Sequence, residues 1–378
     1  MRNPVYIALG GLLALAAAMG IGRFVYTPIL PFMVAEMSLG SSDAGLIASA
    51  NFLGYLVGAL AASMGFLPGS RRLWFLGALL LSALTTAAMG MTILIDAFLA
   101  LRFIGGIASA FVLVFSSALI LERLNEAGRP GLSSIHFAGV GCGIAISSIA
   151  VAVLAANGMG WRALWIVSGL LTLLFLVIAA FLVPGESKEP SAGAPQAASS
   201  GRISGRLVRL IIGYGLFGFG YVITATFISV ITRDDPALNP AEPYVWLIAG
   251  LAAAPSVYLW VRTADRIGGA SALSIACIIE AFAVVLSVVA DTPAFVLVAS
   301  ALFGVTFMGI TALGLIEAHK LAPHASRQTL AIMTASFGLG QVIGPWFAGQ
   351  LHSNTGSYEM ASFIAAGALV VSAALVRR

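Results

Sequence analysis

Twelve long apolar segments, separated by short stretches rich in charge, Pro or Gly, constrain the fold of this chain more than any other feature. An α-helix needs about 20 predominantly apolar residues to cross a hydrocarbon layer about 30 Å thick. The sequence predicts such helices at residues 5–35, 42–67, 72–94, 97–121, 131–156 and 162–183, and again at 207–232, 244–262, 270–290, 293–318, 326–351 and 357–376. We therefore expect an all-α membrane protein with twelve transmembrane helices.

Charged residues are scarce, which supports the same interpretation. Asp, Glu, Lys and Arg make up 9% of the 378 residues and 60% are hydrophobic, whereas soluble domains carry about 25% charged residues. This composition excludes a water-soluble enzyme, a nucleic-acid-binding protein, a disordered tail and a disulfide-stapled secreted domain. The lipid bilayer is the first partner that the sequence predicts.

One polar stretch divides the twelve segments into two sets of six. Residues 185–205 are rich in Ala, Ser and Gly and contain two prolines, which predicts a flexible linker. Gly20–Arg23 and Gly218–Tyr221 lie about halfway along the first helix of each set, which indicates a duplication. We expect an N-terminal bundle at 1–184 and a C-terminal bundle at 206–378, the arrangement of a rocking transporter with a site at the bilayer midplane.

The positions of Lys and Arg predict the orientation. Loops on the side of the two termini hold 15 of the 19 Lys and Arg residues, and the opposite loops hold only Arg162 and Arg233. Because Lys and Arg in short loops stay on the cytoplasmic side, we expect both termini in the cytoplasm and the chain in the inner, or plasma, membrane.

Two stretches resemble the major facilitator superfamily, and within it the YbfB/YjiJ-type branch. They are GIGRFVYTP at Gly20–Pro28 and YGLFGFGY at Tyr214–Tyr221, continuing through Ala225-Thr226-Phe227. The resemblance covers essentially the whole chain. It implies two six-helix bundles and transport by alternating access, without naming a substrate.

Shorter motifs of the superfamily occur at unusual places. Asp265-Arg266-Ile267-Gly268, after the eighth helix, is similar to the charged motif usually found between helices 2 and 3. The resemblance implies that Asp265 and Arg266 form a charge lock at the cytoplasmic gate; the alternative is a solvated loop. Gly340–Pro345 on the eleventh helix resembles a motif that exporters carry on helix 5, which slightly favours efflux over uptake.

Three ionisable residues lie inside predicted membrane helices, where an unpaired charge is costly. Arg23 could grip a carboxylate or phosphate, or could bond to carbonyl groups of a neighbouring helix. Arg102 begins the fourth helix, within a stretch similar to the superfamily's intramembrane arginine motif, so we consider a coupling role or snorkelling toward outer water. Glu280 is a candidate for proton coupling, although an internal hydrogen bond within the C-terminal bundle is the stronger alternative.

Further polar and aromatic side chains share helix faces with each other by their spacing of three and four residues. They would suit an amphipathic organic ligand, but aromatic core packing explains any single one equally well. With Arg23, the predicted substrate-binding residues are Tyr26, Asn51, Tyr55, Tyr214, Tyr221, Thr224, Gln341 and Trp346.

The sequence offers little sign of other chemistry. The four histidines lie at separate helix ends without a second ligand at metal spacing, so we expect no metal site. Glycine clusters are not followed by a Walker lysine, so ATP-driven transport is not supported, and no cofactor is expected. Because the spans lack paired carboxylates or a nucleophile with a base, we do not expect an enzyme.

The sequence thus predicts a secondary active transporter, a permease that moves a small organic anion or zwitterion, coupled to protons and directed toward efflux. Two intramembrane arginines against one acid would repel a lipophilic cation. Two alternatives stay open: an exporter of neutral or cationic hydrophobic compounds, and a membrane sensor or scaffold that keeps the fold without transport.

Overall fold

The computed structural model describes residues 3–63, 68–185 and 204–377, and its helices match the twelve predicted spans. The first six spans are α1 (Pro4–Leu15) with η1 (Ala16–Ile21) and α2 (Tyr26–Met37), then α3 (Ser41–Ser63), α4 (Arg71–Ala88), α5 (Ile95–Glu126), α6 (Ser133–Ala156) and α7 (Trp161–Leu182). The second six are α8 (Gly205–Asp234), α9 (Glu242–Ile267), α10 (Gly269–Val289), α11 (Pro293–Leu321), α12 (Ser326–Thr355) and α13 (Glu359–Arg377). Twelve helices of the described chain are long and apolar enough to cross a membrane, so the predicted all-α fold is confirmed.

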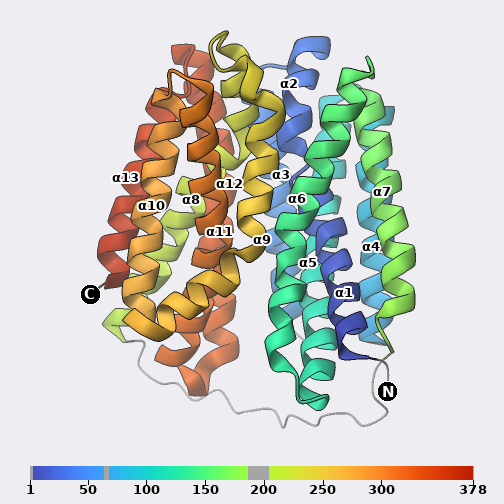
Figure 1. Cartoon of the computed structure of the whole chain (residues 1–378), viewed down its shortest axis with the longest axis vertical. Helices are drawn as coiled ribbons and strands as arrows, with labels where there is room; N and C mark the ends of the chain where they lie inside the picture. The colour runs from blue at the N-terminus through green and yellow to red at the C-terminus, as the bar shows by residue number, and fades with distance from the viewer. Residues whose placement is uncertain (1–2, 64–67, 186–203, 378) are drawn as a thin grey trace.

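The helices run up and down in two groups (Figure 1): the first group holds α1–α7 and the second group holds α8–α13. α4–α7 stand on one side of the molecule and α10, α11 and α13 on the other, while α3, α9 and α12 lie between them. α1 begins and α13 ends at the same face, which we call the termini face; the other end is the opposite face. All but the ends of the predicted linker at 185–205 lies outside the described residues, and the division into two domains stays a proposal.

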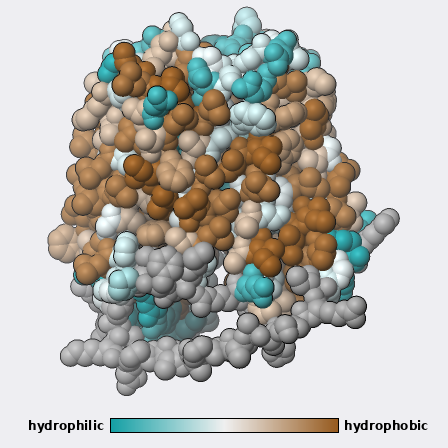
Figure 2. All heavy atoms as spheres, turned by 180° about the vertical axis from the view of Figure 1, so that it is seen from behind, coloured by the Kyte–Doolittle hydropathy of each residue, from teal (hydrophilic) through white to brown (hydrophobic). Residues whose placement is uncertain are grey.

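The outer surface of the helices is apolar. Figure 2 shows hydrophobic side chains over the middle of the molecule and hydrophilic ones gathered at its upper end. Phe181 on α7, for example, is 74% exposed. Lipid tails solvate such side chains, so this band is where the bilayer surrounds the protein.

The first span is interrupted, which corrects the prediction of one helix at 5–35. α1 continues into the π-helical turn η1, the chain turns at residues 22–25, and α2 then begins at Tyr26. Pro28 has no N–H to donate to the carbonyl group four residues earlier, that of Phe24, which accepts from the Thr27 N–H at 3.3 Å instead. The turn at residues 22–25 lies directly before this point and carries the predicted site residue Arg23.

Small residues let the helices of the first group approach closely. In α3 and α5, a Cβ atom added to Gly54 or to Gly106 would lie nearer than 3.0 Å to backbone atoms of the other helix. Membrane helices without a strong hydrophobic drive use such backbone approach for association. The pair α3 and α5 is consequently held at a fixed spacing.

The two groups touch near the middle of the molecule, where a Cβ atom at Gly141 of α6 would meet the backbone of α9, and toward the opposite face. On α12, a Cβ atom at Gly349 would meet the carbonyl group of Ser41 at the start of α3. Thr27 of α2 donates a hydrogen bond to the Ala225 carbonyl of α8. These contacts separate the middle of the molecule from the opposite face on the side of α2, α3, α8 and α12.

We predict that Gly106→Ala destabilises the protein and that Gly367→Ala does not. The added methyl group at residue 106 meets the Asn51 carbonyl, whereas residue 367 of α13 has open space within 4 Å. Overpacking costs about 1–3 kcal/mol, while Ala is favoured over Gly in a helix interior by up to about 1 kcal/mol. Thermal unfolding in detergent measures both; an equal fall in melting temperature for the two variants would contradict the packing argument.

Candidate functional site

A cavity of about 600 Å³ lies between the two helix groups. It reaches from the middle of the molecule to the termini face, where its mouth is lined by Ser133 and Ser134 at the start of α6 and by Arg262 and Asp265 at the end of α9. Its closed end is formed by Arg23, Tyr55, Tyr221 and Gln341, and its walls include Met19, Phe24, Val140, Phe307 and Phe337. The cavity is thus an apolar chamber with a polar end.

A hydrogen-bonded bridge at the closed end joins the two helix groups. The Arg23 guanidinium donates through Nη2 to Oε1 of Gln341 at 3.0 Å. The amide nitrogen of Gln341 in turn donates to the Tyr221 hydroxyl group. Because a guanidinium can only donate, the Gln341 oxygen must face Arg23, which fixes the direction of the whole bridge.

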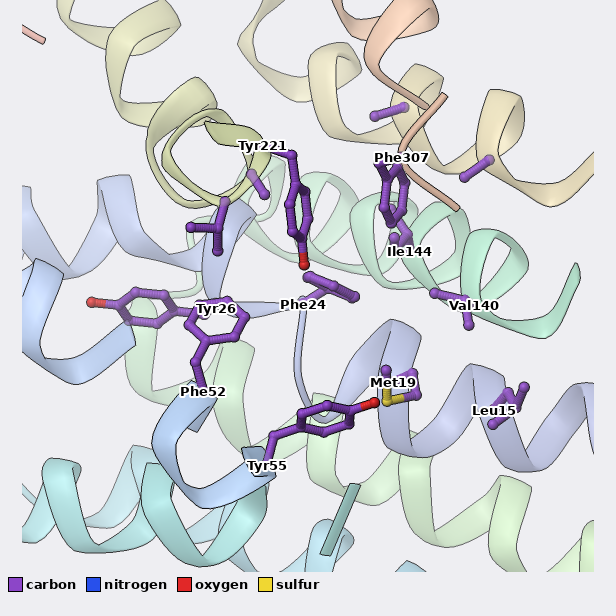
Figure 3. Packing of buried hydrophobic residues seen from close by; sticks show 14 of the residues in the cluster. Leu15, Met19, Phe24, Tyr26, Phe52, Tyr55, Val140, Ile144, Tyr221 and Phe307 are labelled. Atoms are coloured by element: carbon purple, nitrogen blue, oxygen red, sulfur yellow. The ribbon is translucent and has the colours of Figure 1, made fainter. Parts of the chain in front are cut away.

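Arg23 is also held by aromatic rings. Its Cζ lies 4.0 Å from the ring centroid of Tyr55 and 4.7 Å from that of Phe52, so both rings make cation–π contacts with it. Figure 3 shows the Tyr55 ring beside Met19, on the α1 side of the chamber. These contacts stabilise the cation and hold it at the cavity.

No carboxylate among the described residues forms an ion pair with Arg23. Its side chain is 3% exposed, and its Nε has no hydrogen-bond partner in the same part of the chain. Burying a charge without a counter-ion costs free energy. A bound anion would remove this cost, so the closed end of the cavity is suited to a carboxylate or phosphate group.

Stacked aromatic rings form one wall of the chamber. The Tyr221 ring lies nearly parallel to Phe337, with centroids 5.8 Å apart, and to Phe307, with centroids 5.9 Å apart. In Figure 3, Tyr221, Phe307 and Phe24 face the same space. Such a wall favours a ligand with a flat or apolar body.

Arg102 has a different role from Arg23. It is 4% exposed, so the predicted snorkelling to outer water does not occur. Its guanidinium donates to the carbonyl oxygens of Gly22 at 3.1 Å and of Arg23 at 3.0 Å. These carbonyl groups belong to the interruption of the first span, so Arg102 satisfies backbone that the helix leaves free.

Five predicted binding residues lie outside the cavity. Tyr26 donates to the Ala44 carbonyl at 2.9 Å, and in Figure 3 it points away from the chamber. Asn51 donates to the Arg102 carbonyl at 2.9 Å, and Tyr214 to that of Thr311 at 3.0 Å. Thr224 is buried, whereas Trp346 is 45% exposed on a shallow apolar groove along α3, α5 and α12. The structure therefore brings together Arg23, Tyr55, Tyr221 and Gln341 of the predicted binding residues.

The remaining predicted residues are dispersed. Glu280 is fully buried between α10 and α11, where Thr306 donates to its Oε2. Asp265 lies at the cavity mouth and neighbouring Arg266 is exposed at the same face. Neither forms a salt bridge with another described residue. Within the described ranges, groups of three or more His, Cys, Asp or Glu that could hold a metal are absent.

Sequence reasoning missed the aromatic part of the site. Phe24, Phe307 and Phe337 line the cavity, but a Phe in an apolar helix has the same pattern as a core residue. Only Phe24 carried a signal, because it follows Arg23 directly in the chain.

Comparison with known proteins gives both a family and a relative. The family described as "Uncharacterised MFS-type transporter YbfB" matches residues 15–377. "Uncharacterized MFS-type transporter YcaD" from Escherichia fergusonii is 30% identical over 182 residues. That alignment covers 46% of this chain and 45% of the relative, so the matched part spans less than half of the relative's length.

Solved structures share the fold. The crystal structure of the nucleoside transporter NupG, in a mutant form, has a TM-score of 0.76 at 15% identity and covers 98% of both chains. The crystal structure of a bacterial homologue of the human lysosomal transporter Spinster, in an inward-facing and occupied conformation, has a TM-score of 0.73 at 14% identity. It covers 100% of this chain and 97% of its own. At these identities the likeness concerns the fold alone.

We predict that Arg102→Met destabilises the protein more than Arg23→Met. Removing Arg102 leaves the carbonyl groups of Gly22 and Arg23 buried without those donors, at about 1–3 kcal/mol each. Both substitutions remove a buried charge that has no counter-ion among the described residues, so this term is similar for the two. The difference is that removing Arg23 breaks one hydrogen bond, to the Gln341 side chain, which can rotate toward another partner. Thermal unfolding of both variants in detergent measures the difference, and a smaller loss for Arg102→Met would refute the assignment.

Proposed function

This chain belongs to the family of YbfB-type MFS transporters, and we propose that it moves a small organic carboxylate across the membrane by alternating access. The chain is an integral, multi-pass membrane protein by its family and its twelve spans. The proposed ligand, an anion or zwitterion with an apolar or aromatic body, is inferred from the cavity. Arg23, Tyr55, Tyr221 and Gln341 are the proposed contacts.

The observation that carries the proposal is the buried Arg23 cation at the closed end of an apolar cavity. A carboxylate placed there would pair with a guanidinium that lacks a counter-ion among the described residues, and the pair is strong in a water-poor site. A cationic ligand would meet an uncompensated positive charge in the same place. The Phe307 and Phe337 rings would cover the apolar body of the ligand.

Alternating access requires that the two helix groups separate at one face while they meet at the other. In this conformation the cavity is continuous with the termini face, and the contacts of α3 with α12 and of α2 with α8 separate it from the opposite face on their side of the molecule. The bridge from Arg23 through Gln341 to Tyr221 crosses between the groups. A carboxylate that competes with Gln341 for Arg23 would loosen this bridge and so couple binding to movement.

Orientation and direction complete the proposal. The excess of Lys and Arg in loops at the termini face supports a cytoplasmic location for that face in the inner membrane, so the cavity would load from the cytoplasm and efflux is the proposed direction. For proton coupling we propose Glu280, because it is fully buried within a span. Arg102 would act indirectly, by holding the interrupted backbone that carries Arg23.

The first test measures flux of carboxylates in proteoliposomes. We expect a panel of aromatic and aliphatic carboxylates to contain transported solutes, and Arg23→Gln to reduce their apparent affinity at least about tenfold, the effect of losing one charged hydrogen bond. Arg162→Gln is the matched control, because Arg162 also contacts an aromatic ring, that of Trp161, but lies at the opposite face away from the cavity. Flux of cationic dyes alone, unchanged in Arg23→Gln, would instead favour an exporter of hydrophobic cations.

The second test locks the opposite face. Gln350 of α12 donates a hydrogen bond to Ser42 of α3, so cysteines at both positions, with Cys142 and Cys277 replaced by Ser, can be joined by a short bifunctional methanethiosulfonate reagent. We expect this reagent to stop flux and a reductant to restore it, because the face could no longer open; Ser42→Cys alone is the control. Full flux through the cross-linked protein would rule out alternating access. If the protein binds no solute of the panel at all, a sensor or scaffold is favoured.

A further inference from the structure

A second, smaller cavity opens toward the opposite face between the two helix groups. It has a volume of about 300 Å³ and is lined by residues of α2, α6, α8, α9 and the turn before α9. Asn239 and Pro243 at its rim are exposed, whereas Pro28 and Trp246 at its deep end are buried. We call this cavity the vestibule; its residues have no place in the function proposed above.

Two hydrogen-bond donors of the vestibule are buried and unsatisfied. Nη1 of Arg233 and Nε1 of Trp246 have no partner among the described residues. Trp246 is 1% exposed, and the Arg233 Cζ lies 4.0 Å above the ring of Phe32, which also lines the vestibule. Buried donors of this kind normally find an acceptor. A carboxylate has two acceptor oxygens, so one can accept from Arg233 Nη1 and the other from Trp246 Nε1.

A pair of aromatic rings lies in contact where the vestibule and the central cavity approach each other. Phe24 lines the central cavity and Trp246 lines the vestibule. Their ring centroids are 6.2 Å apart, and Phe24 is in turn 6.2 Å from Phe307. A movement of the turn at residues 22–25 relative to α9 would part these two rings. The two cavities lie on one route between the faces of the molecule.

We propose that the vestibule is a second carboxylate site on the transport route, in which Arg233 and Trp246 Nε1 hold the carboxylate and Phe32 covers its apolar body. This proposal deepens the proposed function, and rests on it for the identity of the solute. Glu242 also lines the vestibule and interacts electrostatically with Arg233. Its negative charge competes with a ligand carboxylate for Arg233 and disfavours a second carboxylate on the same ligand. The vestibule therefore selects monocarboxylates over dicarboxylates and passes them to or from Arg23 when the Phe24–Trp246 pair opens.

Fluorine NMR of the purified full-length chain, labelled with 5-fluorotryptophan, tests the vestibule directly. The Trp246 resonance is identified as the one missing from Trp246→Phe. Benzoate is the probe, and benzylamine is the control of opposite charge. We expect benzoate, and not benzylamine, to shift the Trp246 resonance saturably, and Arg233→Gln to weaken this effect at least tenfold. Glu242→Gln should strengthen it and should also admit phthalate.

Three variants separate the vestibule from the central site. Arg162→Gln should behave as the parent protein, because it lies at the same face but outside the vestibule. If the Trp246 shift persists in Arg23→Gln and is lost in Arg233→Gln, the vestibule is an independent site, even if flux assays reject the central one. The proposal would be overturned if the Trp246 shift were lost in Arg23→Gln but unchanged in Arg233→Gln. It would also be overturned if the parent protein gave no saturable shift, because the two donors would then bind water alone. If Arg233→Gln does not fold, the Glu242→Gln result decides.

Discussion

The backbone of the first span imposes the constraint on which the rest of the structure depends. Within a bilayer every backbone carbonyl group must find a donor in the protein, and the interruption at residues 22–25 releases several from helical bonding. Arg102 supplies two of the missing bonds, to Gly22 and Arg23. By fixing the backbone of Arg23, it also fixes where the Arg23 side chain enters the cavity.

The two buried arginines use the same guanidinium group in two different ways. The Arg102 guanidinium donates to two backbone oxygens. Its Cζ lies 5.1 Å from the ring centroid of Tyr26 and 5.9 Å from that of Trp165. Arg23 keeps a cation at the edge of an open chamber, held by Tyr55 and by Gln341 of the other helix group. The Nε of each arginine has no hydrogen-bond partner among the described residues. Only Arg23 lines the central cavity, so only its charge is within reach of a ligand there.

Part of the site was accessible from the sequence. Arg23 could be selected because a charge inside a membrane span is rare, and Tyr221 because Gly218–Tyr221 repeats the pattern of Gly20–Arg23. Trp346 could not be placed, because lipid and protein interior are both apolar, so hydropathy does not distinguish the face toward lipid from the face toward the cavity. For the same reason Phe307 and Phe337 resembled ordinary core residues.

The sequence by itself determined the number of spans, their helical state and the three ionisable positions within them, because hydrocarbon excludes charge and unpaired backbone over a fixed thickness. It did not determine that the first span breaks beside Arg23, although Pro28 and Pro31 are visible in it. Nor did it show that Arg102 donates to the carbonyl groups of the interrupted span while Arg23 lines the cavity. Those distinctions depend on which carbonyl, amide or ring lies opposite each guanidinium, and such partners, 318 residues apart for Arg23 and Gln341, meet only when the helices pack.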